Sequence, residues 1–147
     1  MDTPENTFDI EWQGIEYRMD MKTDISEWIR GPGSITHSRS VTIQWTIEGG
    51  GGLDVIKDYL NVSLKFSFSR SYTETNAYTV QVKEGEEARL IYVPRMHHFN
   101  GWLTEWESIP VFLGEYLETH YWQKKYDRAW RAVYFPLPGG QFQLEHR

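Results

Sequence analysis

Side chains of two kinds alternate without a slip over residues 60–83. The even positions, from Leu60 to Val82, are mostly apolar or aromatic, and the odd positions are mostly Ser and Thr. Successive side chains of a β-strand point to opposite faces, so this period of two predicts β-structure with one buried face.

A single straight strand of this length would run about 75–80 Å. A compact domain of this size has a radius of gyration of only about 15 Å. We therefore predict a break within residues 70–76, where Arg70, Glu74 and Asn76 interrupt the apolar face. A hairpin through residues 69–71 and a bent continuous strand both fit, although the hairpin loop lacks the glycine that three-residue loops favour.

Shorter patterns divide the rest of the chain into further strands. Alternating or apolar stretches predict strands at residues 8–12, 15–21, 41–47, 88–93, 102–106, 111–113, 131–135 and 141–144. Gly14 is a turn or a bulge between the first two. Turn signals separate the others at residues 31–33, 49–52 and 84–87, Pro94, Asn100-Gly101 and residues 136–140.

Three segments allow helix. One helical turn is predicted after Thr23, residues 53–59 fit a short helix or a crossing loop, and residues 115–131 fit a helix or, by composition, a strand. The whole pattern predicts an all-β fold, a single-domain antiparallel β-sandwich or barrel-like domain over residues 1–147 with about 8–9 strands.

Composition narrows the function classes. The net charge is −6 and the pI is about 5.3, which argues against nucleic acid as a partner because phosphates would be repelled. Cysteine is absent, so disulfides and thiolate chemistry are excluded. The polar residues after Met1 do not form a signal peptide. We expect either a cytoplasmic protein or the mature form of a secreted one, and slightly favour the extracellular form.

Aromatic residues make up 16% of the chain, including seven Trp. In the C-terminal half, Trp102, Trp106, Tyr121, Trp122 and Trp130 form the candidate ligand-binding set. If several share one face, they would stack on sugar rings or lie at the level of lipid headgroups. The alternative is that they fill one end of the core.

Other constellations carry little chemistry. His97, His98 and His120 are the one cluster that resembles a metal site, but adjacent strand residues point to opposite faces. Four carboxylates at positions 105, 107, 115 and 118 would supply an acid/base pair only if two of them converged. No nucleophile, phosphate-loop or dinucleotide motif occurs. We predict no catalytic residue, no metal and no cofactor, and lean towards a protein that is not an enzyme.

Three segments, at residues 38–45, 64–75 and 78–85, together resemble the Ser/Thr-rich strands of aerolysin-type β-pore-forming toxins. They are also similar to small secreted fungal proteins of toxin-like or effector-like character. The resemblance implies membrane engagement, with a lipid-facing arm at residues 60–68. The chain departs from these families in lacking cysteines, in having no room for a receptor-binding domain, and in placing Glu74 and Asn76 in the second arm.

Three hypotheses follow. The first is a non-enzymatic toxin-like or effector-like protein that binds a membrane, receptor or protein partner, with homo-oligomers left open. The second is a carbohydrate-binding module, which requires coplanar exposed Trp or Tyr rings. The third is a small β-barrel enzyme, an isomerase or hydrolase, which requires a deep pocket with a convergent carboxylate or histidine.

Overall fold

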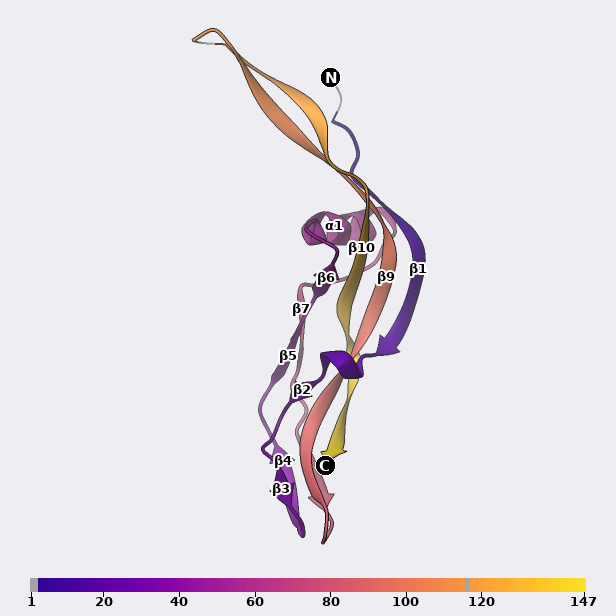
Figure 1. Cartoon of the computed structure of the whole chain (residues 1–147), viewed down its shortest axis with the longest axis vertical. Coiled ribbons are helices and arrows are strands. Elements are labelled where there is room, and N and C mark those ends of the chain that lie inside the picture. Colours follow the sequence, from indigo (N-terminus) through magenta and orange to yellow (C-terminus); the bar gives the residue numbers. More distant parts are fainter. Residues whose placement is uncertain (1–2, 116) are drawn as a thin grey trace. The chain divides into compact units, whose positions relative to one another are not determined.

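The computed structural model describes residues 3–115 and 117–147, and these contain ten strands, one α-helix and one 3-10 turn (Figure 1). In chain order they are β1 (Thr7–Tyr17), η1 (Met19–Met21), β2 (Thr23–Asp24), β3 (Ile29–Arg30), β4 (Gly33–His37), β5 (Val41–Gln44), β6 (Thr46–Glu48), α1 (Leu53–Ser63), β7 (Ser71–Glu74), β8 (Tyr78–Val82), β9 (Glu87–Leu113) and β10 (Leu117–His146). The prediction of an all-β fold with antiparallel strands and little helix is confirmed.

The strands form three sheets. One has the order β1-β9-β10-β6, with β2 and β3 also paired to β9, and the other two are the pairs β4-β8 and β5-β7. Contacts divide the chain into two compact units. Unit 1 comprises Met1–Gln13, Thr46–Phe68 and Phe99–Val133, and unit 2 comprises Gly14–Trp45, Ser69–His98 and Tyr134–Arg147. The single domain over residues 1–147 stays a prediction.

In unit 1, the helix α1 replaces the first part of the predicted long strand. Ile56 and Leu60, four residues apart, are both fully buried, so the 3.6-residue period prevails over the period of two here. Asn61 then closes the chain back on itself, because its side chain donates to the Phe68 carbonyl at 2.9 Å and accepts from the Phe68 amide at 2.8 Å. The strand, and with it the lipid-facing arm, predicted at residues 60–68 is therefore wrong.

In unit 2, the predicted break inside the alternating stretch is confirmed, because residues 75–77 separate β7 from β8. Of the two alternatives, the hairpin is wrong, because β7 and β8 do not pair with each other. Instead β8 pairs with β4, and β7 pairs with β5. The bent strand is closer to the structure, since β7 and β8 follow one another across the break. The core beside this ribbon is made by Ile35, Val82, Ala88 and Leu90, with Phe142 and Leu144 packed against it.

Two predicted turns are strand interiors. Asn100-Gly101 lies within β9, where a Cβ on Gly101 would overlap the main-chain carbonyl of Asp9, so glycine serves the close approach of β1. Residues 136–140 lie within β10. Proline is tolerated there because the second neighbour of β10, β6, has only three residues, so most of β10 has an open edge.

Near the N-terminus the structure differs from the prediction in three places. Gly14 lies inside a continuous β1, and residues 19–21 form a 3-10 turn instead of a strand. After Thr23 there is no helical turn, since β2 and β3 both pair with β9.

Pro94 does not end its strand. Its carbonyl accepts from the Arg18 amide at 2.9 Å, at the point where the neighbour of β9 changes from β1 to β2.

Candidate functional site

The hairpin of β9 and β10 ends in a two-stranded arm, residues 106–123, which belongs to unit 1. The Trp106 amide donates to Asn6 Oδ1 at 2.8 Å, immediately before β1 begins. Beyond that point the arm extends past α1 and β1 with no third strand beside it (Figure 1). Of the two alternatives for residues 115–131, the strand is the one observed, over residues 117–131 of β10, while Glu115 lies in a turn; Tyr116 lies outside the described residues.

Polar side chains join the two strands of the arm. Gln123 Nε2 donates to Glu107 Oε1 at 2.7 Å, and Ser108 Oγ lies 3.2 Å from His120 Nδ1. Gly114 closes the turn with φ of 80°, a left-handed conformation that glycine adopts without strain. The arm is thus held by its own contacts.

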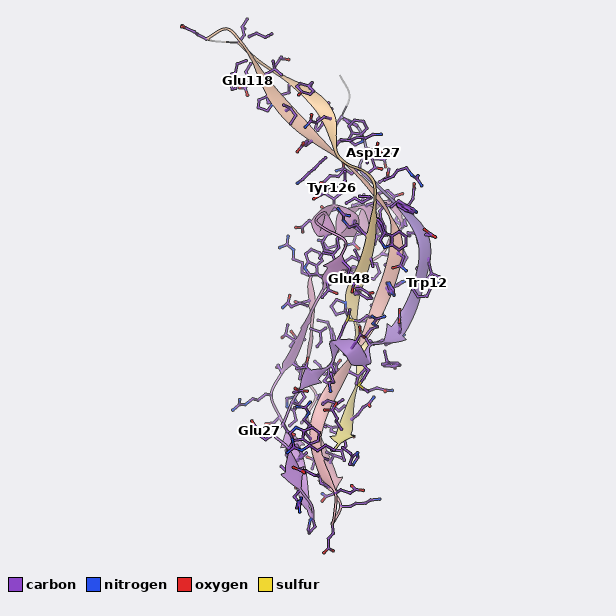
Figure 2. The ribbon with its side chains drawn as sticks, viewed as in Figure 1. Trp12, Glu27, Glu48, Glu118, Tyr126 and Asp127 are labelled. Atoms are coloured by element: carbon purple, nitrogen blue, oxygen red, sulfur yellow. The ribbon has the colours of Figure 1, made fainter. Side chains whose placement is uncertain are left out.

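The end of the arm carries apolar side chains that nothing described covers. Phe112 is 71% exposed and Leu117 is 66% exposed, and Leu113 is also exposed. Glu118 lies towards this end, whereas Tyr126 and Asp127 lie at the base of the arm (Figure 2). An isolated two-stranded ribbon is marginally stable in water, and exposed apolar groups of this kind mark interaction sites.

The aromatic candidates fall into separate groups. Trp102 and Trp130 are in contact, with ring centroids 5.2 Å apart and planes at 69°. Trp106 lies under the Lys124 ammonium, 5.4 Å from its ring centroid. Tyr121 is exposed, and Trp122 is half-buried on the arm. The structure therefore brings together one pair, and that pair is not the flat platform that the carbohydrate hypothesis requires.

Trp102 is fixed by polar contacts on two sides. Its Nε1 donates to Glu11 Oε2 at 3.0 Å, and the Arg128 guanidinium lies 5.7 Å from its ring centroid. Arg128 also pairs with Asp9 at 3.3 Å. These contacts join β10 to β9 and β1, so the pair of Trp102 and Trp130 buttresses the base of the arm.

The three histidines are divided between the two units. His98 pairs with Glu16 at 2.6 Å in unit 2, burial lowers the pKa of His97 there, and His120 belongs to unit 1. Glu105 is buried and lies 3.8 Å from the Lys125 ammonium, so it takes part in a structural ion pair. Among the described residues, no group of three or more His, Asp or Glu side chains is placed to hold a metal ion.

Sequence reasoning missed the apolar end of the arm. The pattern predicts a strand at Val111-Phe112-Leu113, and it does not predict that this strand ends in solvent. No family model matches the chain, and no curated protein matches it. Among the residues that the structure describes, no helix has the length and apolar character needed to cross a membrane.

Proposed function

We propose that the chain is a non-enzymatic protein of toxin-like or effector-like type that engages a lipid bilayer with the end of the arm. The observation that supports this is the exposure of Phe112, Leu113 and Leu117 at the end of a two-stranded ribbon. Apolar side chains placed there gain free energy only when another phase or partner covers them.

The order of side chains along the arm favours a bilayer as that phase. Leu117 is followed after four residues by Tyr121, about 13 Å further along a strand. The headgroup region adds about 5–7 Å on each side of the hydrocarbon core. With Leu117 only a short way into the hydrocarbon, Tyr121 and Trp122 lie among the headgroups, where Tyr and Trp are enriched. Lys124 and Lys125 lie further out, where basic side chains are attracted to anionic lipids.

Two carboxylates at the end of the arm limit the depth of insertion. Glu115 follows the turn glycine, and Glu118 lies 3.5 Å from His120. Charged carboxylates do not enter hydrocarbon without a large cost. We therefore expect shallow insertion into one leaflet, with the carboxylates turned towards the interface.

The test is co-sedimentation with phosphatidylcholine vesicles, prepared with and without an anionic lipid. Burying Phe112 and Leu117 contributes about 1.5–3 kcal/mol each. The double variant Phe112→Ser, Leu117→Ser should therefore bind at least ~100-fold more weakly. Both side chains are exposed in the free protein, so we expect folding to be unchanged.

Val62→Ser is the matched control. Val62 is 73% exposed on α1 in the same unit, so its replacement removes an exposed apolar side chain away from the arm. Binding should then stay at the level of the wild type. A wild type that ignores both kinds of vesicle, or a double variant that binds as well as the wild type, would refute a bilayer as the partner. The arm would then be tested against protein partners.

A further inference from the structure

Unit 2 contains an open pocket of about 270 Å³, whereas the five aromatic candidates belong to unit 1. Residues 23–25 line it on one side, and His37 with residues 39–42 line it on the other. The second group spans the end of β4, the connection and the start of β5. This pocket is independent of the arm and of the bilayer proposal.

The strand pairs β4-β8 and β5-β7 follow one another as a ribbon whose hydrogen bonds are interrupted at this pocket. The register of the two pairs is nevertheless the same. Gly33 pairs with Val82 at one end and Gln44 with Ser71 at the other. Each step forward on one strand matches one step back on its partner throughout. No residue is inserted at 38–40 or at 75–77, so the register allows a continuous ladder there, and none is formed.

The missing pair can be identified. The Trp45 amide donates to the Arg70 carbonyl at 2.8 Å, and hydrogen-bonded pairs alternate along an antiparallel ladder. From the pair of Trp45 and Arg70, the hydrogen-bonded pairs recur at every second residue towards the N-terminus. The pair that this pattern predicts inside the gap, and that is absent, is Arg39 with Asn76. The Asn76 amide is taken up by Glu74 Oε1 at 3.1 Å. The main chain of Arg39 has no hydrogen-bond partner among the described residues.

Arg39 is a charged residue at a position where the strand alternation predicts a buried side chain. Residues of the same parity on this strand are the buried ones, namely Ile35, His37, Val41 and Ile43. The alternation therefore places Arg39 in the core-facing column, where the ribbon opens and leaves its side chain exposed. A guanidinium at a core-facing position, with a pocket opened around it, indicates a charge reserved for a ligand.

The neighbouring groups add hydrogen-bond donors. His37 is only 9% exposed, and its buried Nε2 has no hydrogen-bond partner among the described atoms. Ser40 supplies a hydroxyl to the same wall. The one carboxylate in the lining, Asp24, pairs with Arg89 at 3.1 Å, so its charge is already compensated.

We propose that this pocket binds a small oxyanion, a phosphate or sulfate group, free or as a monoester. Arg39 supplies the charge and planar guanidinium donors that match such oxygens. The main-chain amide released from the ladder, His37 Nε2 and the Ser40 hydroxyl complete the set of donors. The interrupted ladder thus gives the anion the hydrogen bonds that Asn76 would otherwise take.

The test is isothermal titration of the full chain with inorganic phosphate, sulfate, glycerol phosphate and glucose at constant ionic strength. We expect binding of the anions and none of glucose. Arg39→Gln should weaken anion binding by about 10- to 100-fold, the range for hydrogen bonds to charged groups. Arg30→Gln, which removes an exposed arginine from β3 outside the pocket, should leave it unchanged.

Comparing the ligands shows whether the pocket binds a free anion or an anion carried on a larger molecule. Phosphate and sulfate binding with no gain for glycerol phosphate indicates a free ion, and tighter binding of glycerol phosphate indicates an ester or a lipid headgroup. Either result supports the site. Equal anion affinity of the wild type and Arg39→Gln overturns the proposal, and so does preferential binding of glucose. Since Arg39 has no hydrogen-bond or ion-pair partner among the described residues, loss of folding does not obscure the comparison.

Discussion

Replacement of Gly140 by alanine tests whether close packing, and not a turn, requires this glycine. Gly140 lies inside β10, and its φ is not in the left-handed region. A Cβ added there would overlap the hydroxyl and ring of Tyr92 and lie 2.9 Å from the carbonyl oxygen of Val93. Tyr92 is fully buried, so its ring has no room to move aside.

The magnitude follows from two opposed effects. Overpacking a well-packed site costs about 1–3 kcal/mol. Alanine in a strand interior otherwise gains about 0.5–1 kcal/mol over glycine. The net loss should be about 1–2 kcal/mol, which lowers the melting temperature by about 2–8 °C in a chain of this size.

Gly33→Ala provides the control in the same unit. Gly33 also lies in a strand, β4, but its nearest contact for a Cβ is Ile29 Cδ1 at 3.8 Å, which is ordinary van der Waals contact. This variant should be neutral or up to about 1 kcal/mol more stable. Urea unfolding followed by circular dichroism measures both. A Gly140→Ala protein as stable as Gly33→Ala would refute the packing argument.

Two further predictions concern pH. Burial and the nearby carboxylate of Glu74 raise the pKa of Tyr92 to about 12, so the unfolded chain loses this proton first. Stability should therefore fall as the pH rises from about 10 to 12, and Tyr92→Phe should reduce that fall in urea midpoints. Burial acts to raise the pKa of Glu16, but hydrogen bonds to His98 and Arg18 outweigh it, so the pKa is lowered from 4.5. The contribution of Glu16 to stability is present above this value and is lost on acidification, so Glu16→Gln should flatten the acid limb of the stability profile.

The sequence predicted fold class well because the period of two is a local signal. The strands expected at residues 41–47 and 88–93 are largely where the pattern placed them, with one break at Trp45. The errors arose where one residue type serves two purposes. Glycine marks turns, yet Gly101 and Gly140 are required by close packing within strands, and that packing depends on the partner strand.

The strand predicted from residue 60 was wrong for a related reason. The first residues of the alternating stretch, from Leu60, belong to the end of α1, and over so few residues the periods of a helix and of a strand both fit. The ligand-binding role of the five aromatic residues stays a prediction. Residue type points to them, whereas exposure combined with a place at the end of the arm points to Phe112 and Leu117. Whether an apolar run is buried or exposed depends on which elements pack beside it, and local sequence patterns do not predict those neighbours.

Both proposals rest on residues that contradict their local environment: a charge in a core-facing column and apolar groups on an uncovered arm. Such contradictions concentrate at functional sites because folding alone does not select them. Arg39 and Phe112 belong to different units, so the two sites should fail independently. Arg39→Gln should keep full vesicle binding, and the Phe112→Ser, Leu117→Ser variant should keep full phosphate binding. If either variant lost both activities, the effect would lie in the fold and not in a local site, and both proposals would fall together.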